Sequence, residues 1–229
     1  GILITMKFGS SARLDTTPPT LTDTLRSLVR TPSRVTLLGS TGSIGTQAVQ
    51  VIEHLARLAG TTVDAEDAPL KVTAINAGSR SLELLAQQAV RVRAELVATS
   101  GTAQDAQRLQ EYLDAAARSV GISGYSPRIV WGERASVEAA AHPADVVLNG
   151  ITGSIGLEPT LTALKAGHRV ALANKESLIA GGPLVRAAVD ASPLETPMVP
   201  VDSEHSALAQ ALASGTDAEI DRLILTASG

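Results

Sequence analysis

A pair of carboxylates near the C-terminal end of the sequence carries its clearest chemical signal. Asp202 and Glu204 follow the apolar run Met198–Val201 and stand two residues apart. If the backbone is extended there, both side chains point to the same face. Two oxygen ligands on one face, in a chain without cysteine, suit Mg²⁺ or Mn²⁺ better than zinc. A divalent cation held in this way could polarise a ketone and stabilise an alkoxide or enediolate.

The same stretch allows other interpretations. Asp202 or Ser203 could cap a helix expected over residues 204–214, with Glu204 in its first turn. Glu204 could act as a general base without a metal, and His205 could be either a third ligand or a surface histidine. The spacing alone leaves a metal site and a helix cap equally open.

A second polar cluster follows an apolar run earlier in the chain. The run Val170–Ala173 leads directly into Asn174, Lys175 and Glu176, and the preceding run ends at Asn149. In a parallel sheet these turns share the C-terminal edge, where ligands bind. Lys175 could hold a substrate oxygen or phosphate, Asn174 could bind the nicotinamide side of a cofactor, and Glu176 could orient either. The alternative is a plain helix start with Asn174 as its cap and Lys175 in solvent.

A glycine-rich turn separates the apolar run Val35–Leu38 from a helical segment at 44–59. Its glycines stand three residues apart, at Gly39, Gly42 and Gly45. Such glycines let a pyrophosphate approach the backbone, and the N–H groups of the next helix can bind it. Thr41 and Ser43 can add hydroxyl donors. The usual dinucleotide spacing is GxGxxG, so a simple strand-to-helix turn stays an alternative.

The sequence Thr-Gly-Ser-Ile-Gly occurs at 41–45 and again at 152–156, each time after an apolar run. We expect one strand–loop–helix solution to be used twice. The second loop should shape the rim of the site rather than bind another dinucleotide.

The turn after the second apolar run bears on the choice of cofactor. NAD enzymes usually end this strand with an acid that binds the ribose 2′-hydroxyl. Here Val72–Ile75 leads into Asn76-Ala-Gly-Ser-Arg80, which contains no acid. Ser79 and Arg80 suit a 2′-phosphate through charge-assisted hydrogen bonds, which favours NADPH over NADH. Alternatively, Arg80 is a solvated residue at the next helix start.

Short apolar runs alternate with segments of helical period from residue 34 onward. This pattern predicts a Rossmann-type, doubly wound, mostly parallel sheet over residues 34–200, followed by the start of an α+β catalytic domain at 201–229. Residues 1–33 form an extension that we expect to be disordered or loosely packed. The strands are expected at 35–38, 72–75, 96–98, 128–131, 145–148, 170–172, 198–201 and 223–225, and the helices at 44–59, 81–91, 102–119, 133–141, 156–166, 183–191 and 204–214.

Composition argues against several classes of partner. The net charge of −4 and only four aromatic residues give no basis for binding nucleic acid. No apolar run approaches the roughly 18 residues that a membrane span needs. The absence of cysteine fits a reducing cytoplasm, while the Ser-, Thr- and Pro-rich stretch 9–33 leaves plastid-type targeting open.

Taken together, the motifs resemble those of 1-deoxy-D-xylulose 5-phosphate reductoisomerase, over about residues 34–229. The resemblance rests on the order and spacing of Gly39-Ser-Thr-Gly-Ser-Ile-Gly45, Leu172-Ala-Asn-Lys-Glu-Ser177, Val199-Pro-Val-Asp-Ser-Glu-His205 and Leu225-Thr-Ala-Ser-Gly229. It implies an enzyme that uses NADPH and Mg²⁺ or Mn²⁺ to convert 1-deoxy-D-xylulose 5-phosphate into 2-C-methyl-D-erythritol 4-phosphate, for isoprenoid precursors. It also implies a homodimer for the full-length protein.

The resemblance also implies a role for each matching residue. Cofactor contacts fall on Thr41, Gly42, Ser43, Ile44, Asn174 and Glu176. They also fall on the turn Gly78, Ser79 and Arg80, in which Ser79 and Arg80 depart from the Lys or Asn that family members often carry there. Substrate contacts fall on Lys175, Ser203, Glu204 and Ser228. The metal falls on Asp202 and Glu204, which with Lys175 form the catalytic set.

The family continues beyond the Ser-Gly that ends this sequence, with a flap, further phosphate-binding residues, a third carboxylate ligand and a helical domain. We therefore expect this chain alone to bind NADPH without turning over substrate. Two alternatives remain. One is another NADP-dependent dehydrogenase of the semialdehyde or homoserine type, in which the carboxylate pair is a cap. The other is a non-catalytic NADP-binding module.

Overall fold

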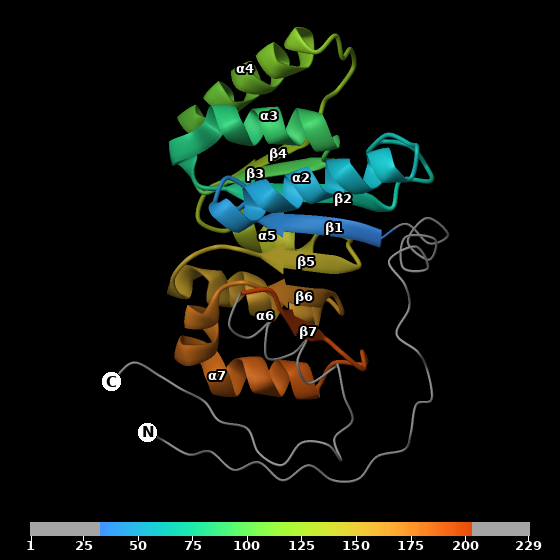
Figure 1. Ribbon diagram of the computed structural model, residues 1–229. Coiled ribbons are helices and arrows are strands. Elements are labelled where there is room, and N and C mark those ends of the chain that lie inside the picture. The colour runs from blue at the N-terminus through green and yellow to red at the C-terminus, as the bar shows by residue number, and fades with distance from the viewer. Residues whose placement is uncertain (1–32, 203–229) are drawn as a thin grey trace.

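The computed structural model describes residues 33–202, which form a parallel sheet covered by helices (Figure 1). The strand order is β4-β3-β2-β1-β5-β6-β7, and every neighbouring pair is parallel. The strands are β1 Ser33–Leu38, β2 Leu70–Ala77, β3 Leu96–Thr99, β4 Arg128–Trp131, β5 Val146–Asn149, β6 Arg169–Leu172 and β7 Met198–Pro200. The predicted doubly wound sheet is confirmed.

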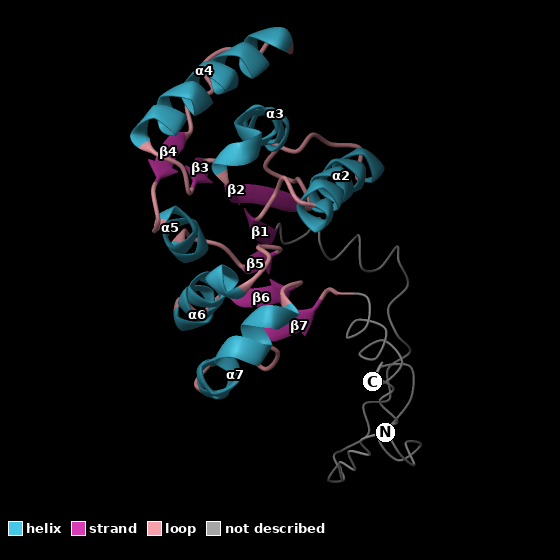
Figure 2. Ribbon diagram, turned by 90° about the vertical axis from the view of Figure 1, so that its left-hand side faces the viewer, coloured by secondary structure: helices cyan, strands magenta, loops and turns pink. Residues whose placement is uncertain are grey.

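Six α-helices within residues 33–202 cover the two faces of this sheet (Figure 2). Buried residues of α2 Ser43–Leu58, α3 Leu82–Val92 and α4 Ala103–Ser119 form one core. Residues of α5 Ala135–Ala141, α6 Leu157–Lys165 and α7 Lys175–Asp190 form the core on the other face. The central strands are therefore buried on both sides, which explains their continuous apolar runs.

Helix α7 corrects one prediction. The sequence indicated a helix over 183–191, but α7 begins at Lys175 and continues through Pro183. The backbone leaves helical geometry at Gly181 (φ −118°, ψ 18°), where the helix is kinked. A Cβ atom at Gly181 would collide with the side chain of Leu157 on α6. The Gly-Gly-Pro sequence is thus a kink that lets two helices approach, and not a helix boundary.

Several predicted features lie outside the described residues. These are most of the extension 1–33, the helix expected at 204–214, the strand expected at 223–225, and the site residues Ser203, Glu204 and Ser228. Within residues 33–202, no helix combines the length and apolar character that crossing a membrane requires.

An ion pair joins the starting ends of β1 and β5. The Arg34 Nη2 atom lies 3.0 Å from Asp145 Oδ1, and the Arg34 backbone N–H donates to Asp145 Oδ2 at 2.7 Å. The hydrogen bond from Arg34 lowers the pKa of the Asp145 carboxyl below its ordinary value. Both side chains are about half exposed, so solvent screens much of this interaction.

We expect Asp145→Asn to lower the free energy of unfolding near neutral pH by about 0.5–1 kcal/mol. Because the folded-state pKa of Asp145 is depressed, its contribution is present above the unfolded-state pKa of about 3.9 and is lost as pH falls through the folded-state value. Urea unfolding of the whole protein at neutral and acidic pH should therefore show a difference that disappears in acid. Asp114→Asn, which removes a carboxylate that accepts from Gln110 on the exposed face of α4, is the matched control. It should leave the free energy of unfolding unchanged at both pH values.

Candidate functional site

The candidate site lies along the C-terminal edge of the sheet, toward the left of Figure 1, where β1 ends and α2 begins. The chain moves outward from β1 through β2 to β4, and then returns to the other side of β1 at β5. This reversal makes the end of β1 a topological switch point, where ligands bind in open α/β sheets. The turns after β1, β2, β5, β6 and β7 all open onto this edge because the strands are parallel.

The first glycine loop is fastened to the end of β2. The backbone N–H groups of Gly39 and Ser40 both donate to the Asn76 carbonyl, each at 2.9 Å. Gly42 is the N-cap residue of α2 and provides no side-chain capping bond. Since glycine has no side chain to cap the helix, the first N–H groups of this 16-residue helix are the donors that an anion at the switch point could use.

Two of the three glycines serve the packing of the protein itself. A Cβ atom at Gly39 would lie 2.8 Å from the Gly150 backbone, and one at Gly45 would lie 2.5 Å from the carbonyl oxygens of Gly39 and Ser40. Gly42 differs, since its Cβ would meet only the Gly39 carbonyl oxygen, at 3.3 Å, and the residue is exposed. Gly39 and Gly45 build the loop, whereas Gly42 leaves its outer side open to a ligand.

The turn after β2 forms a polar hollow together with α3 and α4. Gly78, Ser79 and Arg80 are all exposed, and residues 79–81 make a short 3₁₀ turn before α3. A hollow of about 310 Å³ is lined by polar residues of this turn and of two helices, namely Ser79, Arg80, Ser81, Glu83, Arg108 and Tyr112. Arg108 and Tyr112 come from α4, and no local sequence pattern connects them to this turn.

Two buried asparagines hold the second glycine loop in place. The Asn149 side-chain amide donates to the Gly156 carbonyl at 2.9 Å and to Thr160 Oγ1 at 2.8 Å. The Asn174 side-chain amide donates to the carbonyls of Ile151 and Gly153. The cofactor contact expected of Asn174 stays a prediction, and its amide nitrogen also fixes this loop. Its buried position, with an exposed fraction of 3%, fits that internal role.

The two copies of Thr-Gly-Ser-Ile-Gly share their strand–loop–helix order but not their backbone conformation. Gly42 has φ −75° and leads straight into α2. Its counterpart Gly153 has φ +79° and leads into a 3₁₀ turn at 154–156 before α6. The expectation of one loop solution used twice is therefore wrong in detail, because the asparagine bonds give the second loop a different path.

Lys175 and Glu176 open α7 and are exposed at the same edge. Asp202, the last described residue, is half-buried just beyond β7. The Val201 N–H still donates to the Leu172 carbonyl at 3.0 Å, so Asp202 leaves the sheet beside the turn that carries Lys175. Among residues 33–202, no group of three acidic or histidine side chains is arranged to hold a metal. Glu204, the second carboxylate of the predicted metal site, lies outside this range.

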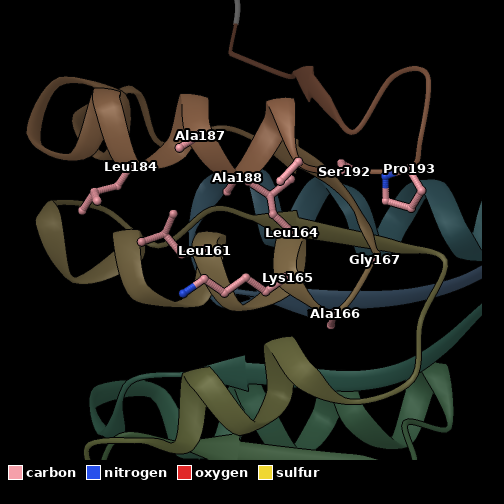
Figure 3. Close-up of a pocket in the computed structure, with 11 residues that line it drawn as sticks. Leu161, Leu164, Lys165, Ala166, Gly167, Leu184, Ala187, Ala188, Ser192 and Pro193 are labelled. Atoms are coloured by element: carbon pink, nitrogen blue, oxygen red, sulfur yellow. The ribbon is translucent and has the colours of Figure 1, made fainter.

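A larger hollow lies elsewhere. It has a volume of about 590 Å³ and is lined largely by apolar residues of α6 and α7, including Leu161, Leu164, Leu184 and Ala188 (Figure 3). Its other walls are Lys165–Gly167 and Ala191–Pro193, where α6 and α7 end. This places it toward the opposite edge of the sheet from the glycine loops.

Comparison with protein families matches residues 35–182 to 1-deoxy-D-xylulose 5-phosphate reductoisomerase, and residues 198–229 to the C-terminal domain of the same enzyme. The chain belongs to this reductoisomerase family. The reductoisomerase of Arthrobacter sp. strain FB24 is 56% identical over 198 residues, which cover 86% of this chain and 46% of that relative. The reductoisomerase of Streptomyces coelicolor is 46% identical over 198 residues, covering 86% of this chain and 43% of that relative.

Solved structures of reductoisomerases share the fold. The Zymomonas mobilis enzyme in complex with NADPH has a TM-score of 0.64 and 36% identity, over 78% of this chain and 41% of that one. A reductoisomerase in complex with NADPH, fosmidomycin and magnesium has a TM-score of 0.60 and 28% identity, over 78% of this chain and 38% of that one. The chain therefore spans a little under half the length of the relatives that it matches. The resemblance inferred from the motifs is confirmed.

Proposed function

We propose that this chain provides the NADPH-binding part and the first metal ligands of a 1-deoxy-D-xylulose 5-phosphate reductoisomerase. The observation that carries the proposal is the glycine loop at the switch point, where the N-cap residue of α2 is Gly42, which has no side chain to cap the helix. The acid-free turn with Arg80 lies beside it. Reductoisomerase structures that contain NADPH and magnesium support the same cofactors here.

The pyrophosphate of NADPH would lie at Thr41, Gly42, Ser43 and Ile44, where the helix start offers N–H groups. The 2′-phosphate would lie at Gly78, Ser79 and Arg80, in the polar hollow after β2. Asn174, which also holds the second glycine loop, would contact the nicotinamide side of the cofactor, as would Glu176 at the adjacent start of α7. When bound, NADPH supplies the hydride that reduces the rearranged substrate.

The metal and substrate would lie next to this cofactor site. Asp202 and Glu204 would hold Mg²⁺ or Mn²⁺, for which carboxylate oxygens are the suitable donors. Lys175, which is exposed at the start of α7, would bind a substrate oxygen, and Ser203, Glu204 and Ser228 would complete the substrate contacts. With Asp202 beside the Lys175 turn, a single sugar phosphate could reach both. We expect the whole protein to be a cytoplasmic homodimer without a nucleic-acid or membrane partner.

The decisive experiment measures loss of NADPH absorbance by the whole protein supplied with 1-deoxy-D-xylulose 5-phosphate, with and without Mn²⁺. Consumption that needs both the substrate and the metal would support reaction, cofactor and metal together. NADPH binding without consumption would contradict the proposed reaction and leave a nucleotide-binding module. Consumption that is independent of metal and supported by a semialdehyde would instead favour another dehydrogenase.

We expect Arg80→Ala to reduce the preference for NADPH over NADH. Loss of a charge-assisted hydrogen bond to the 2′-phosphate should raise the Kd for NADPH by roughly 10- to 100-fold. The Kd for NADH, which lacks that phosphate, should stay within about two-fold. Both values can be measured by fluorescence titration of the whole protein. Arg57→Ala, in the last turn of α2 and away from the site, is the matched control, and an equal weakening for both nucleotides would contradict the role of Arg80.

A further inference from the structure

One polar side chain is buried under the first glycine loop with no place in the roles described above. Gln88 lies on the inner face of α3 with an exposed fraction of 1%, among apolar neighbours such as Leu85, Ala89 and Val92. Its exposed neighbour Gln87 merely bonds Glu83 one turn earlier. Burying an amide among apolar groups is unfavourable unless the amide is hydrogen-bonded.

The amide of Gln88 is used to hold the loop. Its Nε2 atom donates to the Ser40 carbonyl oxygen at 2.9 Å, across 48 residues of sequence. The Ser40 N–H is held from another side by the Asn76 carbonyl. Gly45 packs so closely that a Cβ atom there would lie 2.5 Å from the same Ser40 oxygen. The peptide that follows Ser40 is thus fixed by α3 on one side and by the start of α2 on the other.

Fixing that carbonyl also fixes the next N–H group. In a planar trans peptide, the Ser40 C=O and the Thr41 N–H lie in one plane and point in opposite directions. Because the carbonyl accepts from Gln88 on α3, the Thr41 N–H points away from that helix. The next two residues of the loop, Gly42 and Ser43, are exposed. Among the described residues, no protein acceptor is bonded to the Thr41 N–H.

We propose that Gln88 is a positioning residue for the pyrophosphate of the cofactor. By holding the Ser40 carbonyl toward α3, it aims the Thr41 N–H at the phosphate-binding side of the loop. The inference rests on the proposed NADPH site and adds to it a residue on α3 that does not touch the cofactor. Without this bond, the Ser40–Thr41 peptide can rotate and the loop must be ordered when the cofactor binds, which weakens binding.

The test compares two ligands in the whole protein and its Gln88→Met variant, which keeps the length of the side chain and removes its donor. NADPH carries the pyrophosphate, whereas adenosine 2′-monophosphate carries only the groups expected at Ser79 and Arg80. In the variant we expect the Kd and the KM for NADPH to rise about ten-fold. The kcat should stay within about two-fold, because an interaction lost equally from the ground state and the transition state changes KM alone. The Kd for adenosine 2′-monophosphate should also stay within about two-fold, because this ligand has no pyrophosphate.

Gln87→Met, the adjacent exposed position, is the matched control and should leave every constant unchanged. Equal weakening of both ligands by Gln88→Met, or a melting temperature lowered together with loss of adenosine 2′-monophosphate binding, would assign Gln88 to the core and overturn the inference. Unchanged NADPH binding in the variant would overturn it as well. If the unaltered protein does not bind NADPH at all, the proposed cofactor site itself fails, and this result is distinguishable because it does not depend on the variant.

Discussion

Replacing Gly39 with alanine is expected to abolish tight NADPH binding and to lower the free energy of unfolding by roughly 3 kcal/mol. Gly39 has φ +76°, a conformation that L side chains rarely adopt. A Cβ atom there would lie 2.8 Å from the carbonyl carbon and oxygen of Gly150 and 2.9 Å from the Ile151 nitrogen. These are backbone atoms that cannot rotate away. The first loop would have to separate from the second, and its phosphate-binding N–H groups would move with it.

Gly60→Ala separates the two contributions to this effect. Gly60 has nearly the same backbone angle, φ +73°, but a Cβ atom there would meet nothing within 4 Å. It therefore measures the conformational strain alone, at about 1–2 kcal/mol, and should leave NADPH binding intact. Urea unfolding and fluorescence titration of both variants provide the comparison. If Gly39→Ala were no more harmful than Gly60→Ala, the close contact between the two glycine loops would be wrong.

The centre of the sheet could be predicted from sequence because its central strands are buried on both faces. A run such as Val35–Leu38 reads as a strand without needing alternation, and Gly60 and Gly167, with φ of +73° and +80°, end their helices as their type predicts. The continuation of α7 from Lys175 through Pro183 could not be predicted from local rules, although a helix start after Asn174 was one of the two interpretations of that turn. Those rules treat Gly-Gly-Pro as a boundary, whereas contact with Leu157 turns it into a kink.

The candidate site could be predicted from the sequence where its chemistry depends on a local backbone pattern, as in the loop at 39–45. It could not be predicted where the position of one segment depends on a contact with another. The bond from Gln88 to Ser40 spans 48 residues, and that from Asn174 to Gly153 spans 21. No pattern along the chain encodes such contacts, since they exist only once the sheet brings the segments together. The identical motifs at 41–45 and 152–156 show the same limit, because different supports give them different backbones.

The carboxylate pair leads to the prediction with the largest expected effect on activity. Asp202→Asn in the whole protein should lower kcat by at least about 100-fold, since even residues that only support metal ligands contribute 10- to 100-fold. Mn²⁺ binding, followed by electron paramagnetic resonance, should weaken in parallel. The Kd for NADPH should be unchanged, because Asp202 is separated from the glycine loop. The loop follows β1, and β7, which precedes Asp202, lies two strands beyond β5, the neighbour of β1.

This substitution also distinguishes the metal site from the helix cap that the sequence left open. Asparagine caps a helix about as well as aspartate does, so a purely structural Asp202 would tolerate the change with little loss of stability or activity. A metal ligand would not, because the amide lacks the negative charge that a hard divalent cation favours. Asp190→Asn, at the exposed end of α7, controls for loss of one negative charge and should change neither kcat nor the affinity for Mn²⁺. Full activity and unaltered Mn²⁺ binding in Asp202→Asn would therefore remove Asp202 from the metal site and leave the cap as its role.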